Sequence, residues 1–399
     1  MHYNELNELS LFNNTKPLFI EKIEVRKRTM QLVKPFQSSY GRFDALVRFF
    51  PMITFRTDTG EQVTGVGECP PLSAPWYDGE CHRSAEVGIS YIIASLTGKS
   101  IDDADGLPAS NLNPYTDVIS FMSAYQWIVG HHTAKVGFEG AYWDAVAQLE
   151  SKPMYELWGG RKQLVSTGTS VGLESSINEM MVKISYAVEE MKVARIKLKV
   201  VPGKEIQYLE SVRKHYPDIP LMVDANGVYD LFNRDHLALL NEMDQFNLMM
   251  IEQPGRSDDI LDHARQLANL QTPICLDESI INAHHANQAI NLWKEHSSLD
   301  RLVINIKPPR VGGYYEAIRI AKLCGDAGVS AWCGGMYESA LGKTANVHFN
   351  SRPELNLPGD HVSQGPYFTD DIAASPEYAN GQIHVPEGRG WGIGEMAIQ

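Results

Sequence analysis

A regular alternation of short apolar runs and helical stretches dominates this chain from about Ser166 onward. The runs recur about every 25–30 residues, which is the size of one strand–helix unit. Each run ends in a polar or glycine-rich cluster, and the ends lie at Ser170, Lys199, Asp224, Glu252, Asp277, Lys307 and Gly335. A weaker eighth run reads PELNLPG. Seven or eight such units in succession leave few folds open to the chain.

That repetition is typical of a closed parallel barrel rather than an open doubly wound sheet. No GxGxxG follows any of the runs, which counts against a dinucleotide-binding fold. We therefore predict an α/β protein whose residues 156–359 form a TIM-like (β/α)7β barrel. In barrels the chemistry lies at the C-terminal ends of the strands, where these polar clusters fall.

The flanking segments have different patterns. Residues 1–155 alternate strand-like runs with helical segments, which predicts a separate α+β domain. The tail at 360–399 is rich in Gly and Pro with short strand-like runs, and we expect it to pack on that first domain.

Composition excludes several classes of protein. The net charge of −14 argues against a nucleic-acid or anionic membrane surface, because both need clustered Lys and Arg. No apolar run approaches the roughly 20 residues that span a bilayer. The 5 cysteines are odd in number and lack metal-site spacing. These features predict a cytoplasmic protein with reduced thiols.

The run RIKLKV, residues 195–200, places Lys197 and Lys199 on one face of a strand. Alone, such a run is an exposed strand with a solvated basic face. In a barrel, the aliphatic face packs on the helices, so both lysines must point into the interior. Buried ammonium groups need partners or a chemical role.

Three carboxylates end consecutive strands: Asp224, Glu252 and Asp277. A single one could cap a helix. Three in successive units would repel one another unless a cation lay between them. The set is oxygen-only, which favours Mg²⁺, or Mn²⁺ as a substitute, over zinc or copper. Asn226 and Gln253 are expected to hydrogen-bond around the ligands.

Lys307 ends a strand four positions round the barrel from the two lysines of RIKLKV. A lysine titrates near pH 10.4 and becomes a useful base only when its pKa is lowered. A divalent cation and a neighbouring ammonium group both lower that pKa. Lysines around a metal suit proton abstraction next to a carboxylate, where the metal stabilises the enediolate.

An ordered set of motifs along nearly the whole chain resembles the enolase superfamily. It resembles most closely the branch that contains o-succinylbenzoate synthases and N-acylamino acid racemases. The motifs are KPFQSSYG, GVGECPPLSAPWY, GAYWDAVAQLESKPMYELWGG, KLK, VDANG, IEQP, LDES, NIKPPRVGG, WCGGMYESALG and LPGD. The departures are an apparent insertion at 294–300, a longer N-terminus and Pro309 where glycine was expected.

The resemblance implies a role for each candidate residue. Residues 1–155 would be a capping domain over the barrel. The implied Mg²⁺ ligands are Asp224, Glu252 and Asp277. Lys199 would be the base on one face of a small-molecule carboxylate substrate, with Lys307 on the opposite face. Lys197 would contact the substrate carboxylate, Ser170, Gly334, Gly335 and Met336 would line the pocket, and Arg310 would lie near Lys307.

Two reactions share this machinery. The first is the dehydration that gives o-succinylbenzoate for menaquinone synthesis, which we favour. The second is racemisation of an N-succinyl- or N-acylamino acid by Lys199 and Lys307. A Schiff-base aldolase and a non-catalytic barrel are weaker alternatives, because the first needs no carboxylate set and the second would have lost part of it. The branch also implies a homo-oligomer.

Overall fold

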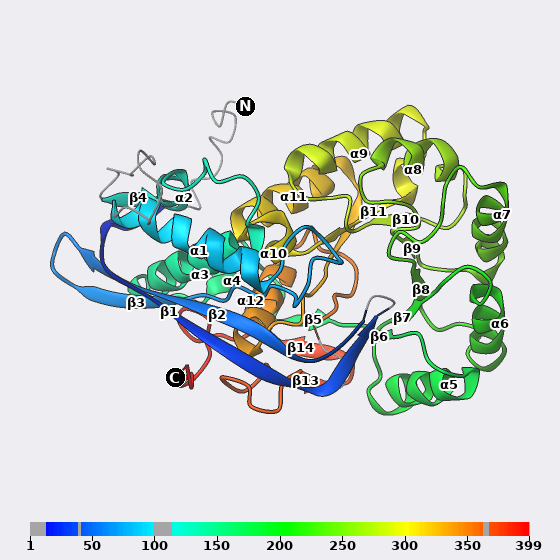
Figure 1. Cartoon of the computed structure of the whole chain (residues 1–399), viewed down its shortest axis with the longest axis horizontal. Coiled ribbons are helices and arrows are strands. Elements are labelled where there is room, and N and C mark those ends of the chain that lie inside the picture. The colour runs from blue at the N-terminus through cyan, green and yellow to red at the C-terminus, as the bar shows by residue number, and fades with distance from the viewer. Residues whose placement is uncertain (1–12, 39–40, 99–113, 362–366, 399) are drawn as a thin grey trace.

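The computed structural model describes residues 13–38, 41–98, 114–361 and 367–398. Its largest sheet is parallel and curls round one side of the molecule (Figure 1). The strands in spatial order are β12 (Ser330–Cys333), β11 (Leu302–Ile306), β10 (Ile274–Leu276), β9 (Ile251–Glu252), β8 (Leu221–Asp224), β7 (Ile196–Lys199) and β6 (Thr169–Val171). This sequential order is that of a (β/α) barrel, as predicted.

Helices follow the strands and cover the outer face of the sheet (Figure 1). They are α5 (Ile177–Ser185), α6 (Glu205–His215), α7 (Arg234–Met243), α8 (Ile260–Leu267), α9 (Ala283–Glu295), α11 (Tyr314–Ala327) and α12 (Ala340–Asn350), with the short α10 (Pro308–Val311) after β11. Side chains cap several of them. Asn282, for example, accepts a hydrogen bond from the backbone of His285 at the start of α9.

The predicted eighth strand does not form as a strand. Its segment closes the circle instead with isolated backbone hydrogen bonds. The amides of Leu357 and Asp360 donate to β12, and Gly359 exchanges hydrogen bonds with the chain just before β6. Pro358 lies between these residues and has no N–H to donate, so a continuous ladder is interrupted there.

A second, antiparallel sheet is built from the N-terminal part of the chain. Its order is β3 (Gln62–Val66), β2 (Gly41–Thr57), β1 (Asn13–Ser38) and β4 (Tyr115–Asp117). The helices α1 (His82–Thr97), α2 (Val118–Ser123) and α3 (His132–Leu149) accompany it, and α4 (Met154–Leu157) leads toward the barrel. The predicted loop KPFQSSYG falls partly on residues 39–40, outside the described residues.

Helix α3 is buried along almost its whole length, because it packs against β3 on one side and α10 and α11 on the other. The approach to the sheet requires glycine. A Cβ atom on Gly67 would lie 1.9 Å from the carbonyl oxygen of Gly137. The core therefore runs from the antiparallel sheet through α3 into the barrel.

The C-terminal tail contacts both halves of the molecule. Strands β13 (Tyr378–Ala379) and β14 (Gln382–His384) join β5 (Leu164–Ser166) at the start of the barrel. Phe368 pairs with Leu32 of β1, and the Trp391 indole donates to the Val66 carbonyl oxygen at 2.7 Å.

The domain boundaries predicted at residues 155 and 359 stay a prediction. None of the described helices combines the length and apolarity that a membrane crossing needs.

Candidate active site

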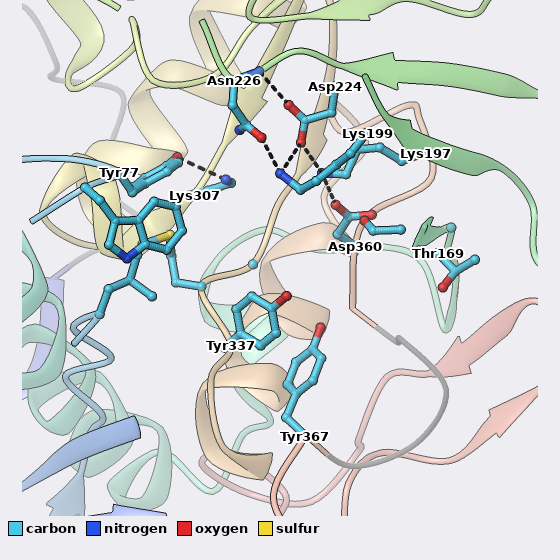
Figure 2. A pocket seen from close by; sticks show the side chains of 16 residues that line it. Tyr77, Thr169, Lys197, Lys199, Asp224, Asn226, Lys307, Tyr337, Asp360 and Tyr367 are labelled. Atoms are coloured by element: carbon cyan, nitrogen blue, oxygen red, sulfur yellow. Dashed lines mark hydrogen bonds and ion pairs between the residues drawn. The ribbon is translucent and has the colours of Figure 1, made fainter. Parts of the chain in front are cut away.

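A pocket opens at the C-terminal ends of the barrel strands (Figure 2). Eight of the residues predicted from sequence line it: Ser170, Lys197, Lys199, Asp224, Asn226, Lys307, Gly335 and Met336. The rest of the lining is Leu72, Trp76, Tyr77, Gly168, Thr169, Tyr337, Asp360 and Tyr367. Glu252, Asp277, Gly334 and Arg310 do not line this pocket but contact or adjoin residues that do.

The strand register brings the predicted carboxylates together. Lys199 pairs with Asp224 across β7 and β8, and Asp224 pairs with Glu252 across β8 and β9. Asp277 follows the last residue of β10, two positions beyond the partner of Glu252. All three carboxylates are buried, with exposures of 4% or less. Their proximity is a direct consequence of parallel pairing between neighbouring strands.

Lys197 is buried among acidic groups on the inward face of β7. Its Nζ lies 2.6 Å from Asp360 Oδ2, 3.3 Å from Glu252 Oε2 and 3.7 Å from Asp224 Oδ2. The ammonium also lies 5.2 Å from the ring centre of Trp332. A solvated basic face is excluded for this strand, since Lys197 is 6% exposed.

Lys199, the last residue of β7, lines the pocket and is less buried than Lys197. It contacts Asp224 at 3.5 Å and donates to the side-chain oxygen of Asn226. Asn226 in turn donates to Glu278 at 2.9 Å and has a left-handed backbone with φ of 45°. That conformation costs an ordinary residue free energy and is tolerated where side-chain contacts compensate for it.

Lys307 reaches the pocket from β11, on the other side from Lys199 (Figure 2). Its Nζ lies 2.8 Å from Asp277 and 3.0 Å from the Tyr77 hydroxyl, which also donates to Asp277. Arg310 forms an ion pair with the other oxygen of Asp277 and donates to the Asn305 carbonyl oxygen at 2.6 Å. Arg310 thus binds a predicted metal ligand directly and lies beside Lys307.

The Gln253 side chain holds the backbone just beyond the end of β10. Its side-chain oxygen accepts hydrogen bonds from the amides of Asp277 and Ser279 at 3.0 and 3.2 Å. It fixes the backbone that carries a predicted ligand, which is the supporting role expected of it. Asn305 plays a similar part by donating to Glu252 at 2.7 Å.

The carboxylate set suits a hard divalent cation by chemistry. All donors are oxygens. One buried oxygen of Glu278 makes no hydrogen bond, and Glu252 Oε2 makes none besides its ion pair with Lys197. In the described residues, however, no group of three acidic, His or Cys side chains is arranged as a closed metal cage. The carboxylates instead turn toward Lys197, Lys199, Lys307 and Arg310.

The charges shift one another's pKa values. Burial lowers the pKa of Lys307, but the Tyr77 hydroxyl and the Glu252 and Glu278 carboxylates outweigh it and raise the pKa overall. The same balance, with Asp360 as the main acidic neighbour, raises the pKa of Lys197. The lowering of lysine pKa values expected from a bound divalent cation therefore stays a prediction, because these directions describe the side chains without a metal. A divalent cation at the same oxygens would act in the opposite direction.

Sequence reasoning missed several residues that line the pocket. Trp76 and Tyr77 belong to a motif quoted for the family resemblance, and Asp360 belongs to another, but none had been given a role. Tyr337 likewise belongs to the quoted motif WCGGMYESALG and had no role assigned. Thr169 and Tyr367 lie in none of the motifs, and Tyr367 reaches the barrel from the tail.

Comparison with known proteins agrees with this geometry. Residues 179–395 match the family described as enolase C-terminal domain-like. The chain is 35% identical to an o-succinylbenzoate synthase of Geobacillus kaustophilus, over 94% of this chain and 92% of that protein. It is also 35% identical to an N-succinylamino acid racemase of an Amycolatopsis species, over 93% and 94%.

A solved member of the enolase superfamily from Listeria innocua has the same fold. It is 31% identical, covers 95% of both chains and superposes with a TM-score of 0.82. Together with the lysines and carboxylates at the barrel mouth, these likenesses place the chain in the enolase superfamily.

Proposed function

We propose that this protein is an o-succinylbenzoate synthase. It would dehydrate 2-succinyl-6-hydroxy-2,4-cyclohexadiene-1-carboxylate by a base-initiated elimination. The observation that carries the proposal is the placement of Lys199 and Lys307 on opposite sides of one pocket, next to buried carboxylates. The near full-length likeness to named synthases supports the choice of substrate.

Lys199 is the proposed base. As a neutral amine it takes the proton on the carbon next to the substrate carboxylate, and the resulting ammonium then protonates the leaving hydroxyl. The products are o-succinylbenzoate and water, so the proton that Lys199 gains in the first step is returned in the second. Asn226 and Asp224 orient the amine through the contacts described above.

Asp224, Glu252 and Asp277 would hold Mg²⁺, the ion that members of the enolase superfamily typically use. Bound there, the ion would stabilise the negative charge that develops on the substrate carboxylate. Lys197 would support the same end of the substrate, since it lines the pocket and its ammonium lies among the acidic groups.

The charges around the pocket suit an anionic substrate. The cations are Arg195, Lys197, Lys199, Lys307 and Arg310, and the carboxylates are Asp224, Glu252, Asp277, Glu278 and Asp360. A divalent cation bound at these carboxylates would leave an excess of positive charge even when Lys199 is the neutral base. A substrate carboxylate would offset that excess, which limits the cost of burying the ensemble.

Racemisation of N-succinylamino acids is the second candidate. It is favoured by the position of Lys307, which faces the pocket from β11 and could return a proton to the face opposite Lys199. N-succinylamino acids are also dicarboxylates. The likeness to the Amycolatopsis racemase points the same way.

The test compares both reactions with purified protein in D₂O, with Mg²⁺ or with EDTA. We expect dehydration of the cyclohexadiene substrate to be much faster than α-deuterium exchange into N-succinyl-phenylalanine. The reverse order would make the protein a racemase. Rates that EDTA leaves unchanged would contradict the metal-dependent mechanism.

We further propose that the enzyme works in the cytoplasm as a homo-oligomer. The 5 cysteines all lie within the described residues and none forms a disulfide, which suits a reducing compartment. Light scattering of the purified protein would test the oligomeric state.

A further inference from the structure

Arg48 lies wholly buried in β2, outside the barrel, and its side chain is 0% exposed. Its guanidinium donates to carbonyl oxygens on three separate segments. One is its own strand, at Val47. The second is the loop after β3, at Pro71, 2.7 Å away. The third is the loop after β12, at Met336 and Tyr337, 3.2 and 2.6 Å away.

Two of the segments that Arg48 binds, the loops after β3 and β12, also carry residues of the pocket. Pro71 precedes Leu72, and Met336 and Tyr337 line the pocket themselves. The Arg48 guanidinium also lies 5.5 Å from the ring centre of Phe368, which follows Tyr367. Four lining residues form what we call the distal wall: Leu72, Met336, Tyr337 and Tyr367. Tyr337 and Tyr367 lie across the pocket from Asp224 and Asn226 (Figure 2).

The distal wall adopts a conformation that needs such support. Tyr337 has a left-handed backbone with φ of 58°, which is strained for an aromatic residue. Its ring lies 5.0 Å from that of Tyr367, centre to centre. The Met336 amide donates to Glu338 at 2.8 Å, so contacts hold this turn at both its amide and its carbonyl groups.

Glu68 completes the connection. Its carboxylate lies 3.4 Å from Arg48 and accepts hydrogen bonds from the Ser339 amide at 2.9 Å and the Ser339 hydroxyl at 2.6 Å. It also accepts from the Gly342 amide at 2.9 Å. The buried pair of Arg48 and Glu68, from β2 and the loop after β3, therefore binds both the start of α12 and the turn before it.

We propose that Arg48 is a positioning residue that sets the distal wall and thereby the enzyme's preference for substrates with a second carboxylate. The inference rests on the proposed function, which supplies the substrate class. Arg48 does not line the pocket. It acts through the carbonyl groups of Met336 and Tyr337 and through Pro71 and Phe368, the chain neighbours of Leu72 and Tyr367. Only a planar fork can bind these separate carbonyls together.

Arg48→Lys keeps the positive charge and removes the planar guanidinium whose separate N–H groups bind the three segments. Arg56→Lys is the matched control, because Arg56 lies on the same strand, pairs with Glu21 at 2.8 Å and covers the ring of Phe19. It is half-exposed and does not line the pocket. Racemisation of N-succinyl-phenylalanine and N-acetyl-phenylalanine is measured for both variants. The two substrates differ in the second carboxylate.

We expect Arg48→Lys to raise KM for the N-succinyl substrate by about 10-fold while kcat changes by less than about 3-fold. The N-succinyl to N-acetyl ratio of kcat/KM should fall about 10-fold, and Arg56→Lys should leave it unchanged. A merely structural role would lower kcat for both substrates equally. An unchanged ratio in Arg48→Lys overturns the inference.

Phe368→Leu provides a second test if Arg48→Lys does not fold. It removes the ring that packs on the guanidinium and leaves no charge unpaired. We expect the same shift of the ratio, by about 2- to 3-fold, and no shift would overturn the inference. If the wild-type enzyme dehydrates the cyclohexadiene but racemises neither amino acid, KM for the cyclohexadiene is compared instead, and an unchanged KM in Arg48→Lys overturns the inference. A wild-type enzyme that turns over neither acylamino acid nor the cyclohexadiene would overturn the proposed function first.

Discussion

The two ends of the pocket are built in different ways. The reacting end, formed by Lys197, Lys199, Asp224, Glu252, Asp277 and Lys307, consists of side chains at the ends of adjacent barrel strands. The distal wall consists of loop and tail residues that Arg48 and Glu68 hold from another sheet.

The difference teaches how chemistry and selectivity are separated in this molecule. Parallel pairing fixes the reacting end, so its geometry follows from the repeat itself. The distal wall depends on contacts between residues more than two hundred and fifty positions apart, such as Arg48 and Tyr337. We expect substitutions at the first end to change the rate of reaction, and substitutions at the second to change which substrate binds.

The largest effect should come from Lys199→Ala, which removes the proposed base. We expect kcat to fall by about 10²–10⁴-fold with little change in thermal stability. Stopped-flow assays and thermal melts would measure both. Lys183→Ala, which removes a surface lysine paired with Glu174, is the control. A loss below about 10-fold would assign the proton transfer to another group.

Asp360→Asn tests the buried ion pairs that connect the C-terminal tail to Arg195 and Lys197. Asp360 is the shared partner of buried Arg195 and Lys197, at 2.8 and 2.6 Å. Leaving both cations without that charge should cost about 3 kcal/mol of the free energy of unfolding, measured by urea denaturation. Asp370→Asn, in the same tail but half-exposed beside Arg28, should cost less than about 1 kcal/mol. An equal loss of unfolding free energy in the two variants would show that the buried ion pairs of Asp360 stabilise the fold no more than an exposed pair does.

Gly334→Ala should displace side chains of the reacting end without adding or removing a charged group. A Cβ atom there would lie 2.7 Å from Lys307 Cε and 2.5 Å from Asn305 Oδ1. We expect Lys307 to be displaced and activity to fall by up to about 100-fold. Gly172→Ala, whose Cβ would meet nothing closer than 3.7 Å, serves as the control. Full activity in Gly334→Ala would show that Lys307 tolerates displacement.

Acid should destabilise the fold through His348, which lies on α12 against the C-terminal tail. Burial lowers the pKa of His348 from 6.5 to about 4, although its hydrogen bond with the Trp391 carbonyl oxygen opposes the shift. A depressed pKa means that the unfolded state binds the proton more readily. The stabilisation is complete above about pH 6.5 and is lost as pH falls toward 4.

The expected loss from this histidine is about 2 kcal/mol between pH 7 and pH 5, measured by urea denaturation at both values. His348→Gln should show a smaller difference between the two pH values than the wild-type protein. An equal difference would mean that other groups account for the acid sensitivity.

The barrel and its reacting end were predictable from the sequence because strand period and unit length are local properties. The markers at Lys199, Asp224, Glu252 and Lys307 fall at or beside the strand ends that the structure shows. Lys197 points inward for the same reason, since alternation along β7 and burial of the aliphatic face leave it no other direction.

The distal wall, the eighth segment and the lysine pKa values were decided by tertiary structure. Tyr367 comes from a tail whose path no local pattern specifies, and Arg48 reads in sequence as one more cation on a strand. Pro358 interrupts a run that hydrophobicity alone predicted as a strand. Periodicity determines which face of an element is buried, but the identity of its partners depends on long-range packing, and here that packing sets the pocket's selectivity.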